Sequence, residues 1–595
     1  MPIAQSFRLL GQSLSLTALA CSWPFLPSAK GAESPRPAQR VAERVGFLGA
    51  PCHPHVEWND ANVGRMKELG FNVMQLNIAW GYRPNDEPLN LEDVVALPDG
   101  FAPTPGDKDR AAIRTPEKIA ARAEALRHRI ALCRKFGMKT IFHFGAPNVL
   151  YPPLEPDVLL DQCISDETVT ARTVALVKAF HEAFPGVDHL LCYTYDQHAW
   201  LCSEAGNCPR CRGVPLHERV TPFVNAIGRT WQSLQPQGVV YWEPWELSAG
   251  QTYRCAELID ASCVGLALHS NIAEVQVALP ADRWFRNMLT KAAERQIRVL
   301  GEVWTGSPTE EMEPYIHIAV PLATLRALRA VNNAGPLQGI KEYYGNVPDK
   351  EDPNLRMTGI FFANPDISDA DGLEQLARPY AAAAEGMVKF WTLSSEAIEM
   401  YPWDVSWLSR EVGRSDPDHL LTAAALKGAS WQTPSWQSSR RTAFLRTDHT
   451  APPNFWMRED NQLRFEQTAA KLEAALLVAD TLDGKIPDAY AATFRENVKE
   501  LRGLRRRVLA YAYHLRETNL ADLLRGDAKQ GLPVNRRTVD ELRSLMLEDQ
   551  ANMEKPAPLA AAIAMLDADL PRFLETYFLP TGPSGKKEGW TITSE

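Results

Sequence analysis

The sequence predicts an α/β fold: a (β/α)8 barrel of the TIM type, followed by an all-α helical C-terminal domain. From residue 45 onward, short apolar runs alternate with longer amphipathic segments, which is the pattern of parallel βαβ units. Eight such runs can be identified, the number that closes a barrel. The alternative is a doubly wound sheet, but no G-x-G-x-x-G motif follows the first run.

The eight runs have the length and apolar character of buried strands. They span residues 45–50, 71–80, 139–146, 189–195, 238–242, 262–269, 297–303 and 337–344. Between them we expect helices over 59–69, 115–136, 168–184, 222–234 and 283–295. Gly70, Gly137, Gly186 and Gly238 fall at helix-to-strand joints, where a left-handed helix cap is expected.

Beyond the barrel, residues 348–372 contain turn residues and predict a loop, and 373–394 predict a helix. Further helices are expected over 465–482, 490–516, 539–554 and 557–577. We therefore assign the barrel to residues 45–405 and the helical domain to 406–595.

The N-terminal segment has the features of a signal peptide over residues 1–32. Arg8 precedes an apolar stretch, and Ala29-x-Gly31 suits cleavage. Residues 33–44 then predict a linker. The sequence thus predicts export to the periplasm or the extracellular space, and Cys21 in ALAC allows a lipoprotein. The alternative is an apolar N-terminal helix of the folded protein. No later run reaches the roughly 18 apolar residues of a membrane span.

The net charge of the chain argues against two classes of binding partner. The 595 residues carry a net charge of -10, which argues against a nucleic acid and against a polybasic membrane-binding patch. The chain has 16 Trp, a residue that serves either in the core or as a platform for sugar rings. The sequence does not indicate an oligomeric state.

Three cysteines follow the fourth strand in a C-x5-C-x2-C pattern: Cys202, Cys208 and Cys211. In an exported protein, two of them can form a disulfide. With Cys192, His198 or His217 as a fourth ligand, they would also suit a structural zinc. Such a closed thiolate site leaves no position for substrate, so no catalytic metal is predicted, and no other cofactor.

Three acids at predicted strand ends are candidates for catalysis, because barrel enzymes build their sites there. Asp196 follows the fourth strand in LLCYTYDQHAW, Glu243 lies in YWEPWE and Glu302 in GEVWTG. Glycoside hydrolysis needs two carboxyl groups, of which the acid has a pKa raised by apolar surroundings. We predict Asp196 as the acid and Glu302 or Glu243 as its partner.

Each acid also has a structural interpretation. Asp196 could cap a helix or anchor the cysteine-rich loop, and Glu302 could be ion-paired with Lys341 or Arg83. Glu243 could be an exposed loop acid.

Aromatic and polar side chains at the same strand ends are predicted to contact a sugar, since rings stack on the apolar face of a pyranose. They are Asn77, Trp80, Tyr82, His143, Tyr195, His198, Trp200, Trp242, His269, Trp304, Glu342 and Tyr344. A competing hypothesis gathers His53, His55, His143 and His269 into the metal site of a metal-dependent hydrolase or lyase.

Over about residues 45–410 the chain resembles glycoside-hydrolase-type (β/α)8 barrels of the broad β-hexosaminidase-like and α-glucuronidase-like group. The resemblance lies in KELGFNVMQLNIAWGYRP, YTYDQHAWLCSEAGNCPRCRG and YPWDVSWLSREVG. It implies a glycosidase acting on an oligo- or polysaccharide. Hexosaminidases carry Asp-Glu at the fourth strand, whereas Asp196 precedes Gln197 here, so the sequence favours a two-carboxylate mechanism or a different sugar altogether. A non-catalytic glycan-binding barrel is the alternative.

Overall fold

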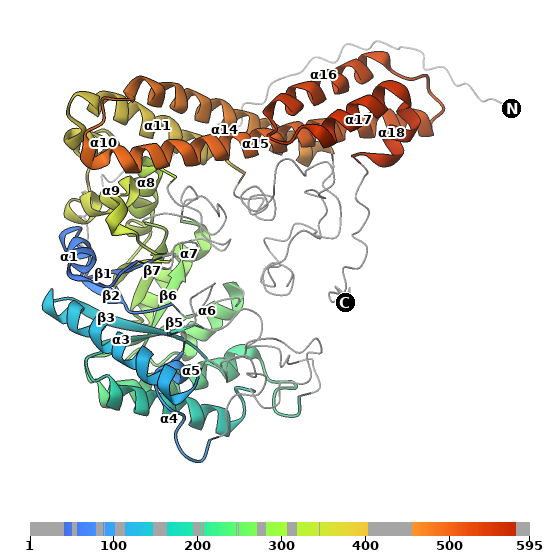
Figure 1. The fold of residues 1–595 in the computed structure, drawn as a ribbon. Coiled ribbons are helices and arrows are strands. Elements are labelled where there is room, and N and C mark those ends of the chain that lie inside the picture. The colour runs from blue at the N-terminus through green and yellow to red at the C-terminus, as the bar shows by residue number, and fades with distance from the viewer. Residues whose placement is uncertain are drawn as a thin grey trace, which may run out of the picture. The chain divides into compact units, whose positions relative to one another are not determined.

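Eight parallel strands close into a barrel in the computed structural model (Figure 1). The structure describes residues 41–49, 56–78, 87–88, 90–101, 114–146, 163–193, 204, 208–244, 247, 249–270, 281–305, 318–343, 345–402 and 455–578. Each strand pairs with its neighbours in sequence, and β8 returns to β1 with Glu43 opposite Gly339. The predicted barrel is confirmed.

Each predicted apolar run overlaps one strand. The strands are β1 (Glu43–Phe47), β2 (Val73–Gln75), β3 (Lys139–Gly145), β4 (His189–Tyr193), β5 (Val240–Glu243), β6 (Val264–His269), β7 (Val299–Val303) and β8 (Gly339–Glu342). Since β1 begins at Glu43, the predicted linker over 33–44 extends too far into the barrel. Residues 1–40, which include the predicted signal peptide and Cys21, lie outside the described residues.

Helices separate consecutive strands along the chain. They are α1 (Asp60–Glu68), α3 (Pro116–Lys135), α4 (Glu167–Ala183), α5 (Leu216–Leu234), α6 (Ala249–Leu258), α7 (Arg283–Glu294) and α8 (Pro321–Asn332). Side-chain caps fix several starts: Asn59 accepts from Asn62 N in α1, and Asp282 from Phe285 N in α7. Helix α5 starts six residues before the predicted 222, and α6 and α8 were not predicted.

Two of the four glycines at the joints adopt the expected left-handed conformation. The φ of Gly70 is +93° and that of Gly137 is +62°. Gly238 has no positive φ; a Cβ there would collide with the indole nitrogen of Trp231, so close packing excludes a side chain.

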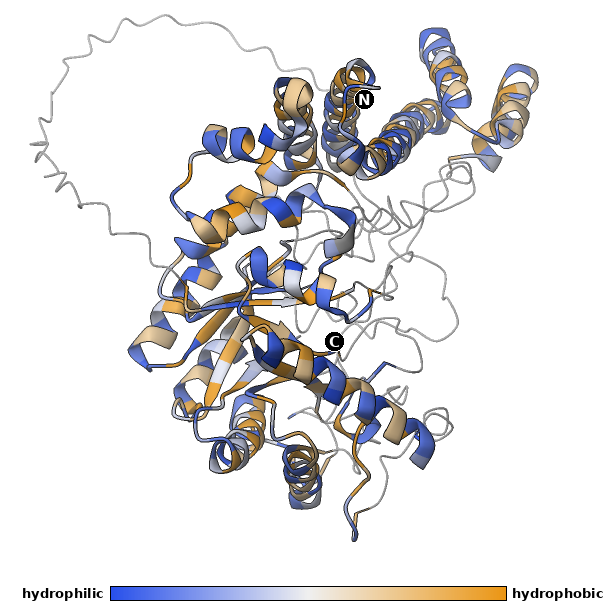
Figure 2. Ribbon diagram, turned by 60° about the vertical axis from the view of Figure 1, so that its left-hand side comes forward, coloured by the Kyte–Doolittle hydropathy of each residue, from blue (hydrophilic) through white to orange (hydrophobic). Residues whose placement is uncertain are grey.

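Strand alternation divides the apolar residues between two layers. The barrel interior contains Val45, Val73, Ile141, Leu191, Val239, Tyr241, Ala267 and Leu300. Their strand neighbours, such as Leu190 and Val240, belong to the main core shared with the helices. Figure 2 accordingly shows strands that are largely hydrophobic and helices that carry both hydrophobic and hydrophilic residues.

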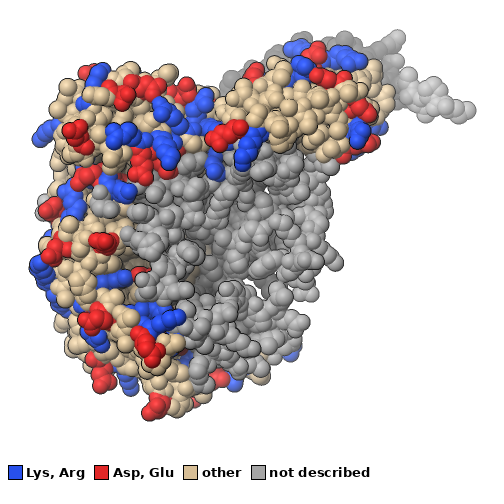
Figure 3. Space-filling model, in the orientation of Figure 1, with Lys and Arg blue, Asp and Glu red and all other residues tan. Residues whose placement is uncertain are grey.

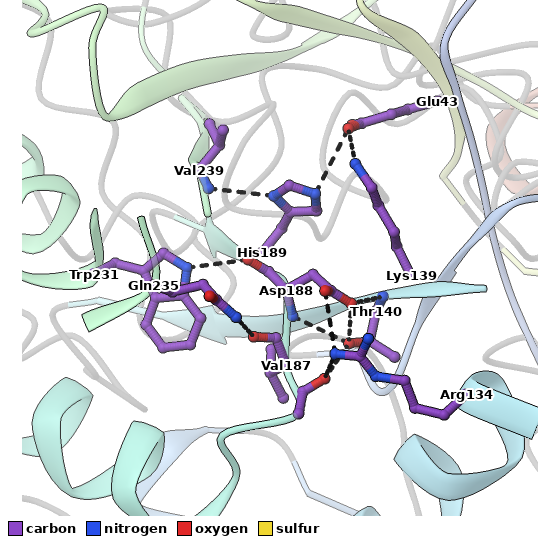
Figure 4. A network of polar contacts seen from close by, with 11 residues as sticks. Glu43, Arg134, Lys139, Thr140, Val187, Asp188, His189, Trp231, Gln235 and Val239 are labelled. Atoms are coloured by element: carbon purple, nitrogen blue, oxygen red, sulfur yellow. Dashed lines mark hydrogen bonds and ion pairs between the residues drawn. The ribbon is translucent and has the colours of Figure 1, made fainter. Parts of the chain in front are cut away.

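A polar network occupies the N-terminal end of the barrel (Figure 4). Glu43 lies 3.3 Å from the Lys139 ammonium and 3.6 Å from Nε2 of His189, and it accepts a hydrogen bond of 2.8 Å from Tyr241. Burial lowers the pKa of His189. At this end of a barrel such contacts serve stability.

The C-terminal part is helical, as predicted. It comprises α9 (Pro353–Ala363), α10 (Asp369–Ala377), η5 (Arg378–Ala383), α11 (Ala384–Met400), α14 (Phe455–Leu482), α15 (Asp488–Lys529), α16 (Arg536–Asn552), α17 (Ala557–Ala568) and α18 (Leu570–Thr576). Helix α11 packs against α14, and Phe390 of α11 contacts Phe494 of α15 with ring centroids 5.7 Å apart.

The loop predicted over 348–372 is wrong, because it contains α9. Asp352 caps this helix by accepting from Leu355 N, and Pro353 occupies its first turn. Helix α9 is buried along much of its length, so its sequence lacks the amphipathic pattern that identified the others. The predicted boundary at 405/406 falls outside the described residues. Among the helices that are described, none is both long and apolar enough to cross a membrane.

Candidate active site

Two of the three predicted acids meet inside the C-terminal end of the barrel. Glu243 ends β5 and Glu302 lies one residue before the end of β7. Both point inward because they lie two residues after the interior residues Tyr241 and Leu300. Both are fully buried, and a carboxylate oxygen of one lies within 4.8 Å of a carboxylate oxygen of the other.

Two histidines flank this carboxylate pair. Nε2 of His269, at the end of β6, lies 3.2 Å from Glu302 Oε2 and 3.8 Å from Glu243 Oε1. Nε2 of His143, on β3, lies 3.7 Å from Glu243 Oε2. His269 retains 13% side-chain exposure, whereas His143 has none. Both histidines were predicted to contact substrate, and the structure brings both to the acids.

Lys341 supplies a positive charge to the pair. Its ammonium lies 2.7 Å from Glu302 Oε1, and both side chains are buried. The predicted ion pair between Glu302 and Lys341 is therefore present, while Arg83 lies outside the described residues. Lys341 also lies 5.4 Å from the ring centroid of Tyr343.

The surroundings shift the protonation of both Glu302 and His269. Burial, and then the neighbouring Glu243 charge, raise the pKa of Glu302, although Lys341 and His269 oppose this. Burial lowers the pKa of His269 to about 4, so its imidazole is neutral at neutral pH. Two buried carboxyl groups this close resist simultaneous ionisation, which favours one shared proton.

Aromatic rings extend from His269 along the same end of the barrel. The Tyr343 ring lies 4.4 Å from that of His269, and Trp304 lies 4.6 Å from Tyr343. Trp304 is buried, so in the described structure it supports Tyr343 rather than presenting an open face. Tyr343 was not among the residues predicted to bind substrate.

Three residues predicted to bind substrate have contacts typical of structural residues. Trp242 faces outward between Tyr241 and Glu243, and it is fully buried in the main core. Asn77 accepts from His143 N at 2.9 Å and donates to His143 O at 2.7 Å, so it joins β3 to the segment after β2.

Glu342 is the third. It follows the inward-facing Lys341 and is buried, and its carboxylate accepts from Thr305 N at 2.6 Å and from Gly345 N at 3.1 Å. We therefore interpret all three residues as structural and do not propose that they contact a sugar.

Several predicted residues lie outside the described part of the chain and stay predictions. They are Asp196, Trp80, Tyr82, Tyr195, His198, Trp200, Tyr344, Cys202, His53 and His55. The acid predicted at the fourth strand therefore has no described geometry, and neither do half of the histidines in the metal hypothesis.

Gln75 and Cys163 were also missed by sequence reasoning. Gln75 lies with Nε2 3.4 Å from His143 Nδ1, and its position midway between the inward-facing Val73 and Asn77 could have identified it. Cys163 joins Cys208 and Cys211 in a buried cluster. It lies 45 residues before Cys208, so no local spacing connects them.

The carboxylate site also has donors for a cation. One atom each of Glu243, His269 and Glu302 lie within 4.8 Å of one another. The Lys341 ammonium already neutralises Glu302, however, so the donor set suits acid-base chemistry better than a divalent ion.

Comparison with known proteins shows likeness in fold. No family model and no curated protein matches the chain. Among solved structures, a GH138 enzyme described as targeting pectin rhamnogalacturonan II matches with a TM-score of 0.54 and 12% identity over 87% of this chain. The match covers 62% of that protein's length.

Two further structures are similar at lower scores. An O-GlcNAc hydrolase mutant from Thermobaculum terrenum has a TM-score of 0.42 at 10% identity, over 90% of this chain and 96% of that one. A chitobiase from Flavobacterium johnsoniae has a TM-score of 0.39 at 12% identity, over 86% of this chain and 75% of that one. The chain shares the eight-stranded parallel barrel of glycoside hydrolases, as the sequence resemblance implied.

Proposed function

We propose that this protein is an exported glycosidase that hydrolyses a glycosidic bond of an oligo- or polysaccharide with Glu243 and Glu302 as its two carboxyl groups. The observation that carries the proposal is their approach to within 4.8 Å at the C-terminal end of the barrel. That is the end where barrel enzymes form their sites. The fold shared with a GH138 enzyme supports the same class of reaction.

The short separation favours hydrolysis with retention. Retaining enzymes hold their carboxyl groups about 5–5.5 Å apart, whereas inverting enzymes leave about 6.5–9.5 Å for a water molecule. In the retaining mechanism one carboxylate attacks the anomeric carbon while the other group protonates the departing glycosidic oxygen. Water then hydrolyses the glycosyl ester, and the second group takes up the proton of that water.

The charges around the pair distinguish the two roles. The ammonium of Lys341, 2.7 Å from Glu302, opposes the rise in the pKa of that group and favours its ionised form, so we assign Glu302 as the nucleophile. Glu243 is then assigned as the general acid and subsequently the general base. The imidazole of His269, neutral at neutral pH, lies with Nε2 3.2 Å from Glu302 Oε2 and helps to position that carboxylate.

Asp196 is the competing acid. If Asp196 protonates the leaving group, Glu243 acts through position and charge, and Glu302 keeps its role. The two assignments differ in how activity responds to the leaving group, because loss of a general acid matters least when the leaving group needs no proton.

The experiment begins with a panel of aryl glycosides, aryl uronides and pectic oligosaccharides; the pectic members are included because of the pectin that the similar GH138 enzyme targets. On an active substrate we expect Glu302→Gln to abolish turnover. Glu243→Gln should lower turnover about 10²–10⁴-fold on a poor leaving group and far less on a dinitrophenyl glycoside. Azide should restore turnover in Glu302→Gly or Glu243→Gly and form a glycosyl azide.

Three results would contradict the proposal. Unchanged turnover in both glutamine variants removes this carboxylate pair from catalysis. Glycan binding by the wild type without turnover on any substrate favours the non-catalytic protein. Activity that is lost to a chelator and restored by metal, while the Tm stays unchanged, favours the metal-dependent enzyme. If Asp196→Asn, rather than Glu243→Gln, shows the dependence on the leaving group, Asp196 is the acid.

A further inference from the structure

We propose that Cys163, Cys208 and Cys211 bind a structural zinc ion. The Sγ atom of Cys163 lies 3.2 Å from that of Cys211 and 3.9 Å from that of Cys208. The three sulfurs all lie within 4.8 Å of one another, and all three residues are buried. They form a cluster separate from the main core, and the site is independent of the proposed hydrolytic function.

Two separate segments of the chain build this cluster. Cys163 begins a turn in which Asp166 N donates to its carbonyl oxygen at 2.8 Å, and Asp166 then caps α4. Cys208 and Cys211 belong to a tight turn before α5, in which Cys211 N and Arg212 N both donate to Cys208 O. Cysteines separated by two residues on such a turn have the ligand spacing of zinc sites.

The distances fit a shared metal ion. Zinc binds thiolate at about 2.3 Å in a tetrahedron, which places sulfurs about 3.8 Å apart. The observed distances of 3.2 and 3.9 Å lie on either side of that value. A disulfide could join two of these sulfurs and would leave the third as a buried thiol in contact with it, whereas one zinc ion engages all three.

Zinc would bind the three cysteines as thiolates and would displace their thiol protons. Structural zinc takes four ligands. Cys202, the third cysteine of the sequence motif, lies outside the described residues. Cys192, another predicted ligand, packs in the main core.

The position of the cluster indicates what the metal would do. Cys163 lies between β3 and α4, and Cys208 and Cys211 lie between β4 and α5. Connections that run from a strand to the next helix form the catalytic face of a barrel. The zinc would thus fasten two of these connections together, as the closed site of a structural metal does.

The test uses the full chain, purified without metal-affinity resin. We expect about one zinc per chain by elemental analysis, as for a mononuclear structural site. Cys163→Ser and Cys211→Ser should lose it. Cys133→Ala and Cys255→Ala remove buried cysteines outside the cluster and should keep it.

A second measurement on the wild type does not depend on the variants folding. Cobalt exchanged into the protein should give the visible absorption of a tetrahedral thiolate site, and chelation of zinc should lower the Tm. After denaturation with a chelator and no reductant, all three thiols should react with iodoacetamide. If two of the thiols react only after reductant is added, they form a disulfide and the proposal is overturned. A folded protein with neither zinc nor a cobalt spectrum overturns it as well.

Discussion

At the scale of single residues, Lys341 supplies a buried positive charge to the candidate active site. A buried ion pair gains little net stability, since desolvation of both charges offsets their attraction. Removal of one partner is costly, because it leaves the other charge buried. Under the proposed function, the pair of Lys341 with Glu302 serves to keep a carboxylate ionised beside Glu243 rather than to add stability.

We predict that Lys341→Met lowers the free energy of unfolding by about 3–5 kcal/mol at pH 8, the usual cost of breaking a buried pair. The cost should shrink toward pH 5, because Glu302, whose pKa is already raised, then takes up a proton. The double variant Lys341→Met/Glu302→Gln should be more stable than the sum of the single changes implies. Urea unfolding measures all three variants.

The control is Lys135→Met. Lys135 lies 2.7 Å from Asp60, the same distance as in the buried pair, but both of these side chains are more than half exposed. Its loss should change stability by no more than about 1 kcal/mol. Additive effects of Lys341→Met and Glu302→Gln would show that the two groups do not interact.

At the scale of elements, β7 and β8 connect the carboxylate site to the loops that follow these strands. Lys341 faces the interior and contacts Glu302, while the next residue, Glu342, faces outward and accepts from Thr305 and Gly345. Successive residues of β8 therefore have different roles. Lys341 supplies a positive charge next to Glu302, and Glu342 joins the residues after β7 to those after β8.

We predict that Glu342→Gln lowers the free energy of unfolding by about 1–3 kcal/mol, the cost of an unsatisfied buried group. The side-chain nitrogen of the introduced glutamine cannot accept a hydrogen bond, so it would face either Thr305 N or Gly345 N without a bond. Urea unfolding tests this, with Glu124→Gln on the exposed face of α3 as the control, where a change within about 0.5 kcal/mol is expected. Equal effects of the two changes would mean that Glu342 does not fasten these loops.

The same strands show what the sequence could and could not predict. Short apolar runs predict eight buried strands. The barrel, and the convergence of Glu243 and Glu302 at one of its ends, could therefore be predicted from the sequence. A residue at a strand end faces either the barrel interior or the surrounding helices, and which one depends on where the inward-outward alternation of that strand begins. Glu243 therefore faces the interior, whereas its neighbour Trp242 faces the helices. Cys163 meets Cys208 because β3 and β4 pair side by side, and α9 lacked an amphipathic pattern because it is buried.

At the scale of the whole molecule, the described part of the surface in Figure 3 shows no region where charge of one sign is concentrated. On the face drawn in Figure 3, acidic and basic side chains are interspersed over the described residues. The response of stability to pH therefore depends on the buried titratable groups. Two of these lie one turn apart on α15: His514 and Glu517.

These two groups shift in opposite directions. Burial lowers the pKa of His514 to about 4 from its usual 6.5. Its contribution to stability is thus complete above pH 6.5 and is lost as the pH falls toward 4, by about 3 kcal/mol in all. Burial and Asp549 raise the pKa of Glu517 well above its usual value of 4.5. Its contribution is complete below pH 4.5 and is lost as the pH rises through the raised pKa.

We predict that His514→Gln and Glu517→Gln change opposite limbs of the pH profile of stability. His514→Gln should remove about 3 kcal/mol of the loss between pH 6.5 and 4, since the unfolded chain no longer binds the extra proton. Glu517→Gln should flatten the decline above pH 4.5, because glutamine keeps the neutral state. Urea unfolding of the full chain from pH 4 to 8 measures both. His269, with a pKa also near 4, is unchanged in either variant and leaves part of the acid-side loss in place. If both variants keep the wild-type profile, α15 does not bury these groups in the protonation states assigned here.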